Sequence, residues 1–289
     1  MIRPMAQSKK EIQDLLAGAS TAPRHRFGQN FMIDQNLVRL IADAGSPAPG
    51  DLIVEVGPGT GTLTDELLAR GASVTAVEID RDLAGLLRSR FEGNPKFSLI
   101  EGDALAGKHA VNEQLAAVLT EAGGQGRPRK LIANLPYNIA SPLIVELLIL
   151  GADLLAFAVQ KEVADRLKAA ANSDDYGPLT VVVQLLGRVE VLRTLPPQAF
   201  WPPPKIDSAL VRITRQARLG PQRTASFSPF LTQLFSARRK TLRKALANAG
   251  YDAGPVLAKL GIDPQLRPET LTPEQVLAIF DETRPRPGA

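Results

Sequence analysis

Three closely spaced glycines could bring main-chain N–H groups against a ligand. They are Gly57, Gly59 and Gly61, in the segment 55–61. Glycine allows positive φ angles and a close approach of the main chain, so such a turn can hold a nucleotide or a nucleoside. A nicotinamide-binding turn has the pattern G-x-G-x-x-G, but the position of its last glycine is occupied here by Thr62. The turn alone leaves open both a ligand-binding role and a purely structural one.

Two acidic residues extend this signal along the chain. Glu78 lies 17 residues past Gly61, and Asp103 follows further on. A carboxylate at Glu78 could accept hydrogen bonds from both hydroxyls of a ribose, and Asp103 could accept one from an adenine amino group. Acidic residues at strand ends also cap helices, which is the structural alternative. Together with the glycine turn, they indicate a nucleoside ligand, either a dinucleotide or S-adenosylmethionine.

The segment 134–137, Asn-Leu-Pro-Tyr, favours S-adenosylmethionine. The amine of adenine is a poor nucleophile because its lone pair is delocalised into the ring. The side-chain oxygen of Asn134 and the carbonyl of Leu135 could accept hydrogen bonds from its two N–H groups, which would leave the lone pair facing a methyl donor. Pro136 would stiffen the turn, and the ring of Tyr137 could stack on an extruded base. A polar turn before a core tyrosine is the alternative, but the segment follows a nucleoside-binding pattern, so we favour adenine methylation.

The elements that must position these residues alternate between strands and helices. Apolar runs predict strands at 52–56, 73–77, 97–100, 130–133 and 154–159, and leucines at helical spacing predict helices that include 62–70 and 142–150. This alternation is typical of an α/β fold with a Rossmann-like parallel sheet covered on both faces. Ligands of such sheets bind beyond the carboxyl ends of the strands, which is where the candidate residues fall.

The remainder of the chain predicts a second, helical part. Apolar, β-branched runs at 179–186 and 189–192 predict two more strands, and the prolines within 196–204 predict a rigid loop. From Ser228 onward the pattern is helical, with Gly and Pro breaks. We therefore expect a catalytic domain over residues 1–218 and a small basic helical domain over residues 219–289.

Positive charge is concentrated in that second part. The chain carries 34 Lys and Arg against 30 Asp and Glu, but residues 209–289 hold 13 against 6. Basic side chains gain affinity for nucleic acids by displacing counterions from phosphates, so the excess favours a polyanionic partner. A solvated surface with chance clustering is the alternative that charge alone leaves open.

Composition excludes several other chemistries. The chain of 289 residues has no cysteine, and its two histidines, His25 and His109, lie far apart in the sequence. A disulfide framework, a thiolate zinc site and a cysteine nucleophile are therefore excluded, and we expect no bound metal. No apolar run is long enough to span a membrane, and the first residues lack the apolar core of a secretory signal. We expect a cytoplasmic protein without a membrane partner.

A set of segments resembles the ribosomal RNA adenine dimethyltransferases, specifically the type that dimethylates two adjacent adenosines of the small subunit. The segments occur in the family's order, and the resemblance covers about nine tenths of the chain. They are GQNFMID at 28–34, EVGPGTG at 55–61, VEID at 77–80, GD at 102–103, NLPYN at 134–138, QKEV at 160–163, FWPPPKIDS at 200–208 and FSARRKTL at 235–242. The glycine turn alone is not specific, whereas the whole set is.

The resemblance implies a Rossmann-like methyltransferase fold with S-adenosylmethionine as its cofactor. Residues 1–30 would close the site. The cofactor-binding residues would be Asn30 and Met32 over the methionine end, Gly57 lining it, Glu78 at the ribose, Asp103 at the adenine, and Asn134 at both the cofactor and the target amine. Family members usually have leucine at the position of Met32. The segment 108–129 is longer than usual, and we interpret it as a surface insertion away from the pocket.

The resemblance also implies how the target base and the RNA are bound. The catalytic residues would be Asn134, Leu135, Tyr137 and Phe200, with the rings of Tyr137 and Phe200 on either side of a flipped adenine. Arg24 and Arg26 flank the pocket entrance and would add phosphate contacts. A basic helix would contact RNA phosphates rather than bases through Arg238, Arg239, Lys240, Arg243 and Lys244. The expected partner is 16S rRNA in the small ribosomal subunit or its precursor, and we expect the protein to be a monomer.

Three alternatives remain open on the sequence alone. An NAD-dependent oxidoreductase would need a glycine at position 62 and a proton donor beside the hydride, and neither is found. A non-catalytic ribosome-assembly or transcription factor could keep the fold for RNA binding only, although Glu78, Asp103 and Asn134 argue against lost chemistry. The sister family that methylates large-subunit rRNA and confers macrolide resistance shares these motifs, so the motifs do not separate the two.

Overall fold

The computed structural model describes residues 7–24, 27–107, 110–216, 218–236 and 240–283. The chain divides into two compact units. Unit 1 comprises Met1–Ala164 and Glu190–Arg215, and unit 2 comprises Asp165–Val189 and Gln216–Ala289. The C-terminal part of unit 2 therefore starts close to the expected boundary after residue 218. The segment Asp165–Val189 differs from the expected division, because it clusters with the C-terminal helices.

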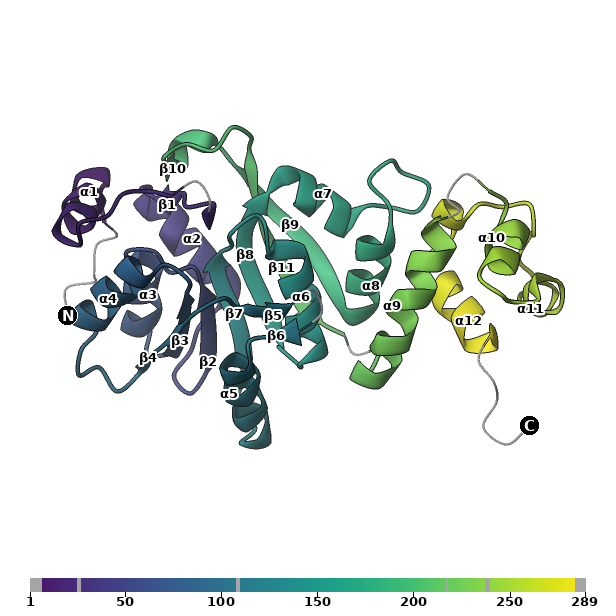
Figure 1. The fold of residues 1–289 in the computed structure, drawn as a ribbon, viewed down its shortest axis with the longest axis horizontal. Coiled ribbons are helices and arrows are strands. Elements are labelled where there is room, and N and C mark those ends of the chain that lie inside the picture. Colours follow the sequence, from purple (N-terminus) through teal and green to yellow (C-terminus); the bar gives the residue numbers. More distant parts are fainter. Residues whose placement is uncertain (1–6, 25–26, 108–109, 217, 237–239, 284–289) are drawn as a thin grey trace. The chain divides into compact units, whose positions relative to one another are not determined.

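A seven-stranded sheet positions the candidate residues (Figure 1). In spatial order its strands are β4 (Phe97–Glu101), β3 (Ser73–Glu78), β2 (Leu52–Val56), β7 (Arg129–Asn134), β8 (Leu154–Gln160), β11 (Ser208–Arg215) and β9 (Gly187–Leu195). The first five pair in parallel, and β11 pairs antiparallel with β8. All of β2 is buried, as expected for a central parallel strand. The α/β fold is thus confirmed, with a mixed rather than a purely parallel sheet.

Unit 1 also contains helices, several of which pack on the sheet. They are α1 (Lys9–Gly18), α2 (Gln35–Gly45), α3 (Thr62–Ala69), α4 (Arg81–Arg90), α5 (Glu113–Gly124) and α6 (Ala140–Ile149), followed by α7 (Lys161–Lys168), which continues into unit 2. Ile41 of α2 and Leu67 of α3 are fully buried in one core cluster with Ile53 of β2 and Ile132 of β7. This packing holds the strands at fixed positions and so fixes where their carboxyl ends lie.

The expected surface insertion has its own secondary structure. It includes β6 (Ala110–Val111), which pairs with β5 (Leu105–Gly107), and then α5. Leu115 and Leu119 of α5 are buried, because this helix packs beside β7. The helix of this segment therefore packs against the sheet, and the segment is not only a surface insertion.

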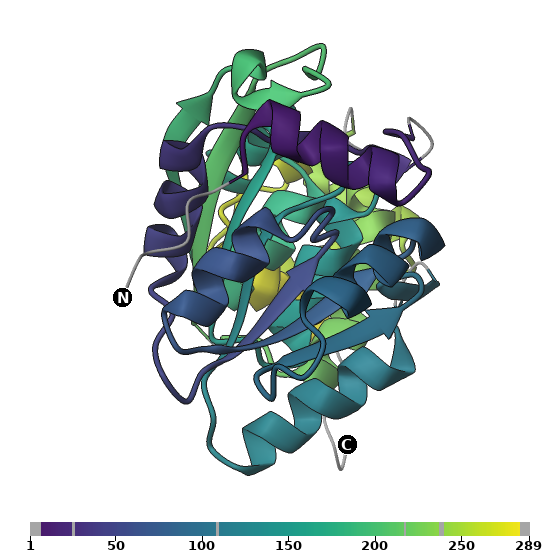
Figure 2. The same cartoon turned by 90° about the vertical axis from the view of Figure 1, so that its left-hand side faces the viewer.

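The N-terminal part of unit 1 runs past the ends of the strands. Its short strand β1 (Phe31–Met32) pairs with β10 (Phe200–Trp201), which places Met32 opposite Phe200. The helix α1, purple in Figure 2, lies beside α4, and the two line a groove. Asp34 is the N-cap of α2, where its side chain accepts a hydrogen bond from the N–H of Asn36 at 2.8 Å.

Unit 2 is helical. Besides the end of α7 it contains α8 (Pro178–Leu186), α9 (Pro221–Ser236), α10 (Leu242–Asn248), α11 (Ala253–Leu260) and α12 (Pro273–Thr283). Its core includes aromatic rings of two helices and one loop. The ring centroids of Phe227 and Phe230 of α9 lie 5.1 and 5.3 Å from that of Phe280 of α12, and the ring centroid of Tyr251, between α10 and α11, lies 5.8 Å from that of Phe230. The helical character expected from Ser228 onward is confirmed and starts earlier, at Pro221.

The strand expected at 179–186 is wrong, because this segment forms α8. Pro178 suits the first turn of a helix, and the hydroxyl of Thr180 accepts from the N–H of Gly177 and donates to the carbonyl of Arg166. A short run that is apolar on all sides fits a buried helix as well as a buried strand. Burial within the helical unit outweighs the strand preference of its valines.

No helix in the described part of the chain is long and apolar enough to cross a membrane. Among the same residues, no three His, Asp or Glu side chains gather in the way that metal ligands would.

Candidate functional site

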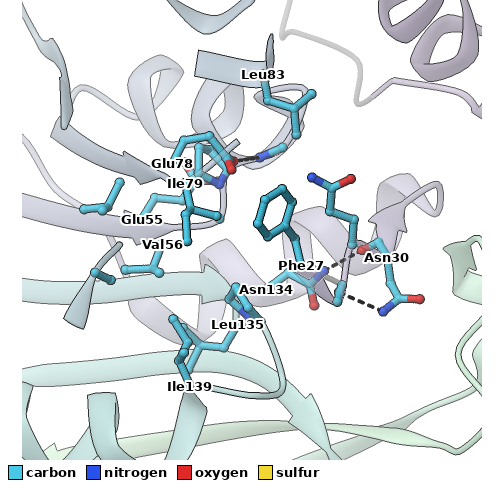
Figure 3. Close-up of a pocket in the computed structure, with 18 of the residues that line it drawn as sticks. Phe27, Asn30, Glu55, Val56, Glu78, Ile79, Leu83, Asn134, Leu135 and Ile139 are labelled. Carbon is cyan, nitrogen blue, oxygen red and sulfur yellow. Dashed lines mark hydrogen bonds between the residues drawn. The ribbon is translucent and has the colours of Figure 1, made fainter. Parts of the chain in front are cut away.

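A pocket in unit 1 lies at the carboxyl ends of the parallel strands (Figure 3). Its lining comes from the N-terminal segment Phe27–Met32 and from residues that follow β2, β3, β4 and β7. Eight of the predicted site residues line it: Asn30, Met32, Gly57, Glu78, Asp103, Asn134, Leu135 and Tyr137. Residues far apart in the sequence are thus brought together where the strand pattern placed them.

The glycine turn after β2 is shaped by close neighbours. Gly57 and Gly59 have φ angles of 69° and 62°, in the left-handed region that glycine tolerates. A Cβ atom at Gly57 would lie 3.0 Å from the ring of Pro136, and one at Gly59 would lie 3.0 Å from the ring of Phe31. Glycine is therefore required both by the backbone conformation and by the segments that press on the turn.

Glu78 ends β3 with its carboxylate inside the site. It is 3% exposed, and its two oxygens accept hydrogen bonds from the N–H of Asp80 at 2.9 Å and of Gly59 at 3.3 Å. Burial raises the pKa of Glu78 to about 7, because the charged form loses water. A ligand that donates hydrogen bonds to this carboxylate, such as a ribose diol, would stabilise its charged form.

A second carboxyl group in the pocket was not predicted. Glu55 of β2 is buried, and burial raises its pKa to about 8 even though the Thr64 hydroxyl donates to it at 2.6 Å. The signal in the sequence was an acidic residue inside the apolar strand Leu52–Val56. Ile79 was also missed: it lines the pocket directly after Glu78 with 44% of its surface exposed.

The side chain of Asn134 is fixed on one side and open on the other. Its Nδ2 donates to the carbonyl of Asn30 at 2.8 Å, as Figure 3 shows. Its Oδ1 is buried and has no hydrogen-bond partner. A buried acceptor without a donor is unfavourable, so this oxygen is suited to an N–H group of a ligand. The Thr62 hydroxyl, which also lines the pocket, is likewise buried without a partner.

Tyr137 and Phe200 differ in their surroundings. Tyr137 lines the pocket, and its hydroxyl lies 2.8 Å from the Ser208 hydroxyl at the start of β11. Burial raises the pKa of Tyr137. Phe200 is 1% exposed within the core cluster and is not part of the pocket lining. The structure therefore does not place the two rings on opposite sides of the cavity.

The other predicted residues have varied positions. Asp103 is exposed at the pocket rim, where its carboxylate accepts from the N–H of Leu105 at 3.0 Å. Arg24 pairs with two carboxylates instead of being directed at a phosphate. In unit 2, Lys240, Arg243 and Lys244 are exposed at and near the start of α10. Arg26, Arg238 and Arg239 lie outside the described residues.

Comparison with known proteins provides an independent view. Residues 21–284 match the family described as "Ribosomal RNA adenine dimethylase". A "Ribosomal RNA small subunit methyltransferase A" of Hahella chejuensis is 43% identical over 263 residues, covering 89% of this chain and 92% of the relative. The protein of the same name from Chromobacterium violaceum is 42% identical, covering 89% of this chain and 94% of the relative.

Solved structures are similar as well. A dimethyladenosine transferase from Plasmodium falciparum aligns with a TM-score of 0.70 at 24% identity, covering 87% of this chain and 96% of the other. The 23S rRNA methyltransferase ErmE aligns with a TM-score of 0.63 at 25% identity, covering 88% of this chain and 99% of the other. These likenesses agree with the α/β fold described above.

Proposed function

The chain belongs to the ribosomal RNA adenine dimethylase family, and we propose that it dimethylates two adjacent adenosines near the 3′ end of 16S rRNA. Methyl groups pass from S-adenosylmethionine to the 6-amino group of each base. The relatives from Hahella chejuensis and Chromobacterium violaceum, both named as small-subunit methyltransferases, support the small subunit as the target. The reaction would form part of small-subunit biogenesis.

One observation carries this proposal at the level of chemistry. The buried Oδ1 of Asn134 lacks a donor, while the Nδ2 of the same amide is held by Asn30. The amide cannot rotate by half a turn about its terminal bond without losing that hydrogen bond, so its oxygen stays directed at the ligand. The carbonyl of Leu135, the next residue and also part of the lining, would supply the second acceptor for the two N–H groups of an adenine amine.

The residues present fit S-adenosylmethionine, which supplies an electrophilic methyl group on a positively charged sulfur. Glu78 would hold the ribose and Asp103 the adenine ring. Asn30, Met32 and Gly57 would surround the methionine end. The buried, unpartnered hydroxyl of Thr62 supports a polar ligand in this part of the pocket.

The residues also suit an acceptor that is neutral before it reacts. Before the first transfer, Asn134 and Leu135 would accept hydrogen bonds from the two N–H groups of the amine. The nitrogen then becomes more pyramidal, and its lone pair is freed from the ring. The proton can leave after the nitrogen has gained its positive charge, so no general base is needed before attack. Tyr137 would stack on the base and hold it in the plane that these acceptors require.

The RNA contacts remain part of the proposal. We expect the exposed Lys240, Arg243 and Lys244 of unit 2, together with Arg238 and Arg239, to contact phosphates. We also propose that the protein acts as a monomer in the cytoplasm, where its ribosomal substrate would be assembled.

A methylation assay tests the function directly. The purified protein is incubated with labelled S-adenosylmethionine and either undermethylated small subunits or large-subunit rRNA, and the digested RNA is analysed for dimethyladenosine. We expect the product in the small subunit only. Product in large-subunit RNA alone would assign the chain to the other branch of the family, and no product in either would contradict the proposed activity.

A further inference from the structure

A buried carboxylate two residues past Glu78 joins three parts of unit 1. Asp80 is the N-cap of α4, and its side chain is fully buried. Its Oδ1 accepts from Arg24 Nη1 at 2.8 Å, and its Oδ2 accepts from Gln29 Nε2 at 3.0 Å. The second Nη atom of Arg24 donates to Asp82 at 2.5 Å. Arg24 and Gln29 also contact each other, because the N–H of Arg24 donates to Gln29 Oε1 at 2.8 Å.

These contacts fasten the segment that closes the pocket. Gln29 belongs to the segment Phe27–Met32, whose residues all line the pocket. Figure 3 shows Phe27 of this segment pointing into the cavity. A ligand held between this segment and the strand ends leaves most readily when the segment moves away. We call the contacts of Arg24 and Gln29 with Asp80 the latch.

The latch is connected to both functional ends of the pocket. The N–H of Asp80 donates to Glu78 Oε1 at 2.9 Å, so the carboxylate expected to hold the ribose is supported by the same residue. One residue after Gln29, the carbonyl of Asn30 accepts from the amide of Asn134. The position of the closing segment therefore affects both the cofactor site and the acceptor for the target amine.

We propose that Arg24 and Gln29 are positioning residues that hold the segment Phe27–Met32 closed through Asp80, so that opening of the latch sets the rate at which S-adenosylmethionine leaves. This inference rests on the proposed function, because it needs that cofactor in the pocket. It also replaces the phosphate contact expected for Arg24, since both Nη atoms already have carboxylate partners.

The chain offers a matched control for this arginine. Arg70 also bridges two carboxylates, with Nη1 2.7 Å from Asp43 and Nη2 2.7 Å from Glu66. The two arginine side chains are similarly exposed, 25% for Arg70 and 33% for Arg24, and each has one well-buried carboxylate partner, Glu66 or Asp80. Arg70 and its partners do not line the pocket. A loss of charge at Arg70 therefore reproduces the general effect of breaking such a cluster.

The test measures cofactor release from the full-length protein. Labelled S-adenosylmethionine is bound, chased with excess unlabelled cofactor and followed by filter binding for wild type, Arg24→Gln, Gln29→Ala, Asp80→Asn and Arg70→Gln. Loss of charge-assisted hydrogen bonds should speed release about tenfold in Arg24→Gln, with a smaller increase in Gln29→Ala. Asp80→Asn keeps a residue that can begin α4 and should also speed release. Arg70→Gln should stay within about twofold of wild type.

Coupling between the variants separates a latch from simple loss of stability. The double variant Arg24→Gln, Asp80→Asn should release the cofactor more slowly than the product of the two single effects predicts, because both substitutions break the Arg24–Asp80 contact. Equal release by Arg24→Gln and Arg70→Gln, or independent effects in the double variant, would overturn the latch. If Arg24→Gln bound RNA more weakly and released the cofactor at the wild-type rate, Arg24 would contact an RNA phosphate, and the latch would be wrong. If wild type itself bound no S-adenosylmethionine, the proposed function would fail together with the latch.

Discussion

The part of the pocket that we propose for the cofactor is built on strand ends, whereas the part that we propose for the target base depends on a turn and on a ring outside the lining. Glu78 ends β3, and the N–H groups of Gly59 and Asp80 donate to its carboxylate. Asn134 ends β7, is held by the carbonyl of Asn30, and borders both parts. Tyr137 lies in the turn between β7 and α6, and Phe200 is packed in the core opposite Met32, outside the pocket lining. Because Phe200 is not in the lining, we expect the cofactor part to be formed in advance and the base part to be completed only when RNA binds.

The acceptor on Asn134 should give the largest effect on the reaction. Asn134→Ala removes a hydrogen bond that forms mainly in the transition state, so we expect the rate of methyl transfer to fall by about 100-fold or more. RNA affinity should change little. The rate is measured in single turnovers at saturating cofactor, and RNA affinity is measured separately by filter binding. Equal losses in rate and RNA affinity would mean that Asn134 only binds substrate.

Glu78 tests the cofactor part without the base. Glu78→Ala should weaken S-adenosylmethionine binding by about 1.5–3 kcal/mol, the size of a lost charge-assisted hydrogen bond. Glu101 is a matched control, because it is the residue paired with Glu78 on the neighbouring strand and lies outside the pocket lining. Calorimetry should find nearly unchanged affinity for Glu101→Ala. The same small effect in both variants would remove Glu78 from the ribose site.

Tyr137 tests the base part. Tyr137→Ala should lose stacking energy of about 1–3 kcal/mol in RNA binding. Tyr137→Phe keeps the ring and loses only the contact with Ser208, so its effect should be smaller and similar to that of Ser208→Ala. Single-turnover transfer and RNA binding are compared for the three variants. Equal damage in Tyr137→Phe and Tyr137→Ala would implicate the hydroxyl and contradict stacking.

The stability of the protein without ligand should also depend on pH. The pKa of Glu55 is raised to about 8 and that of Glu78 to about 7, so the folded protein binds these protons more tightly than the unfolded chain. Unfolding then releases protons, and the free energy of unfolding contributed by these groups falls as the pH rises from about 4.5 through 7 and 8. Thermal denaturation across this range should show the decline, and Glu78→Gln should make it shallower. An unchanged slope would exclude Glu78 as a source.

Much of the site could be predicted from the sequence because parallel strands end at one edge of a sheet. The apolar runs located β2, β3, β4 and β7, and the residues that follow them met in one pocket. Patterns of apolar residues could not decide whether 179–186 is a strand or a helix, since six of its eight residues are buried and they lie on more than one side. Contacts between distant segments were equally hidden. Neither the Ser208 partner of Tyr137 nor the Asp80 partner of Arg24 follows from spacing along the chain.

The positions of the Glu55 and Phe200 side chains could not be predicted for a different reason. Glu55 was visible as an acidic residue in an apolar strand, but the sequence did not reveal that its carboxyl group borders the pocket. Phe200 lies in a segment that matches the family, yet its ring is buried in the core. Burial depends on how β1 and β10 pair, and two-residue strands give almost no periodic signal.

Hydrogen–deuterium exchange measures the contrast between the two parts most directly. Peptides covering the glycine turn, the segment Phe27–Met32 and the strand Phe200–Trp201 are followed without ligand, with S-adenosylmethionine, and with S-adenosylmethionine plus a short RNA carrying the two adenosines. We predict that the cofactor alone slows exchange in the glycine turn and in the closing segment and leaves Phe200–Trp201 unchanged. Exchange at Phe200–Trp201 should change only when RNA is added. A change there with the cofactor alone, or no change with RNA, would contradict an account in which the base part is completed by RNA.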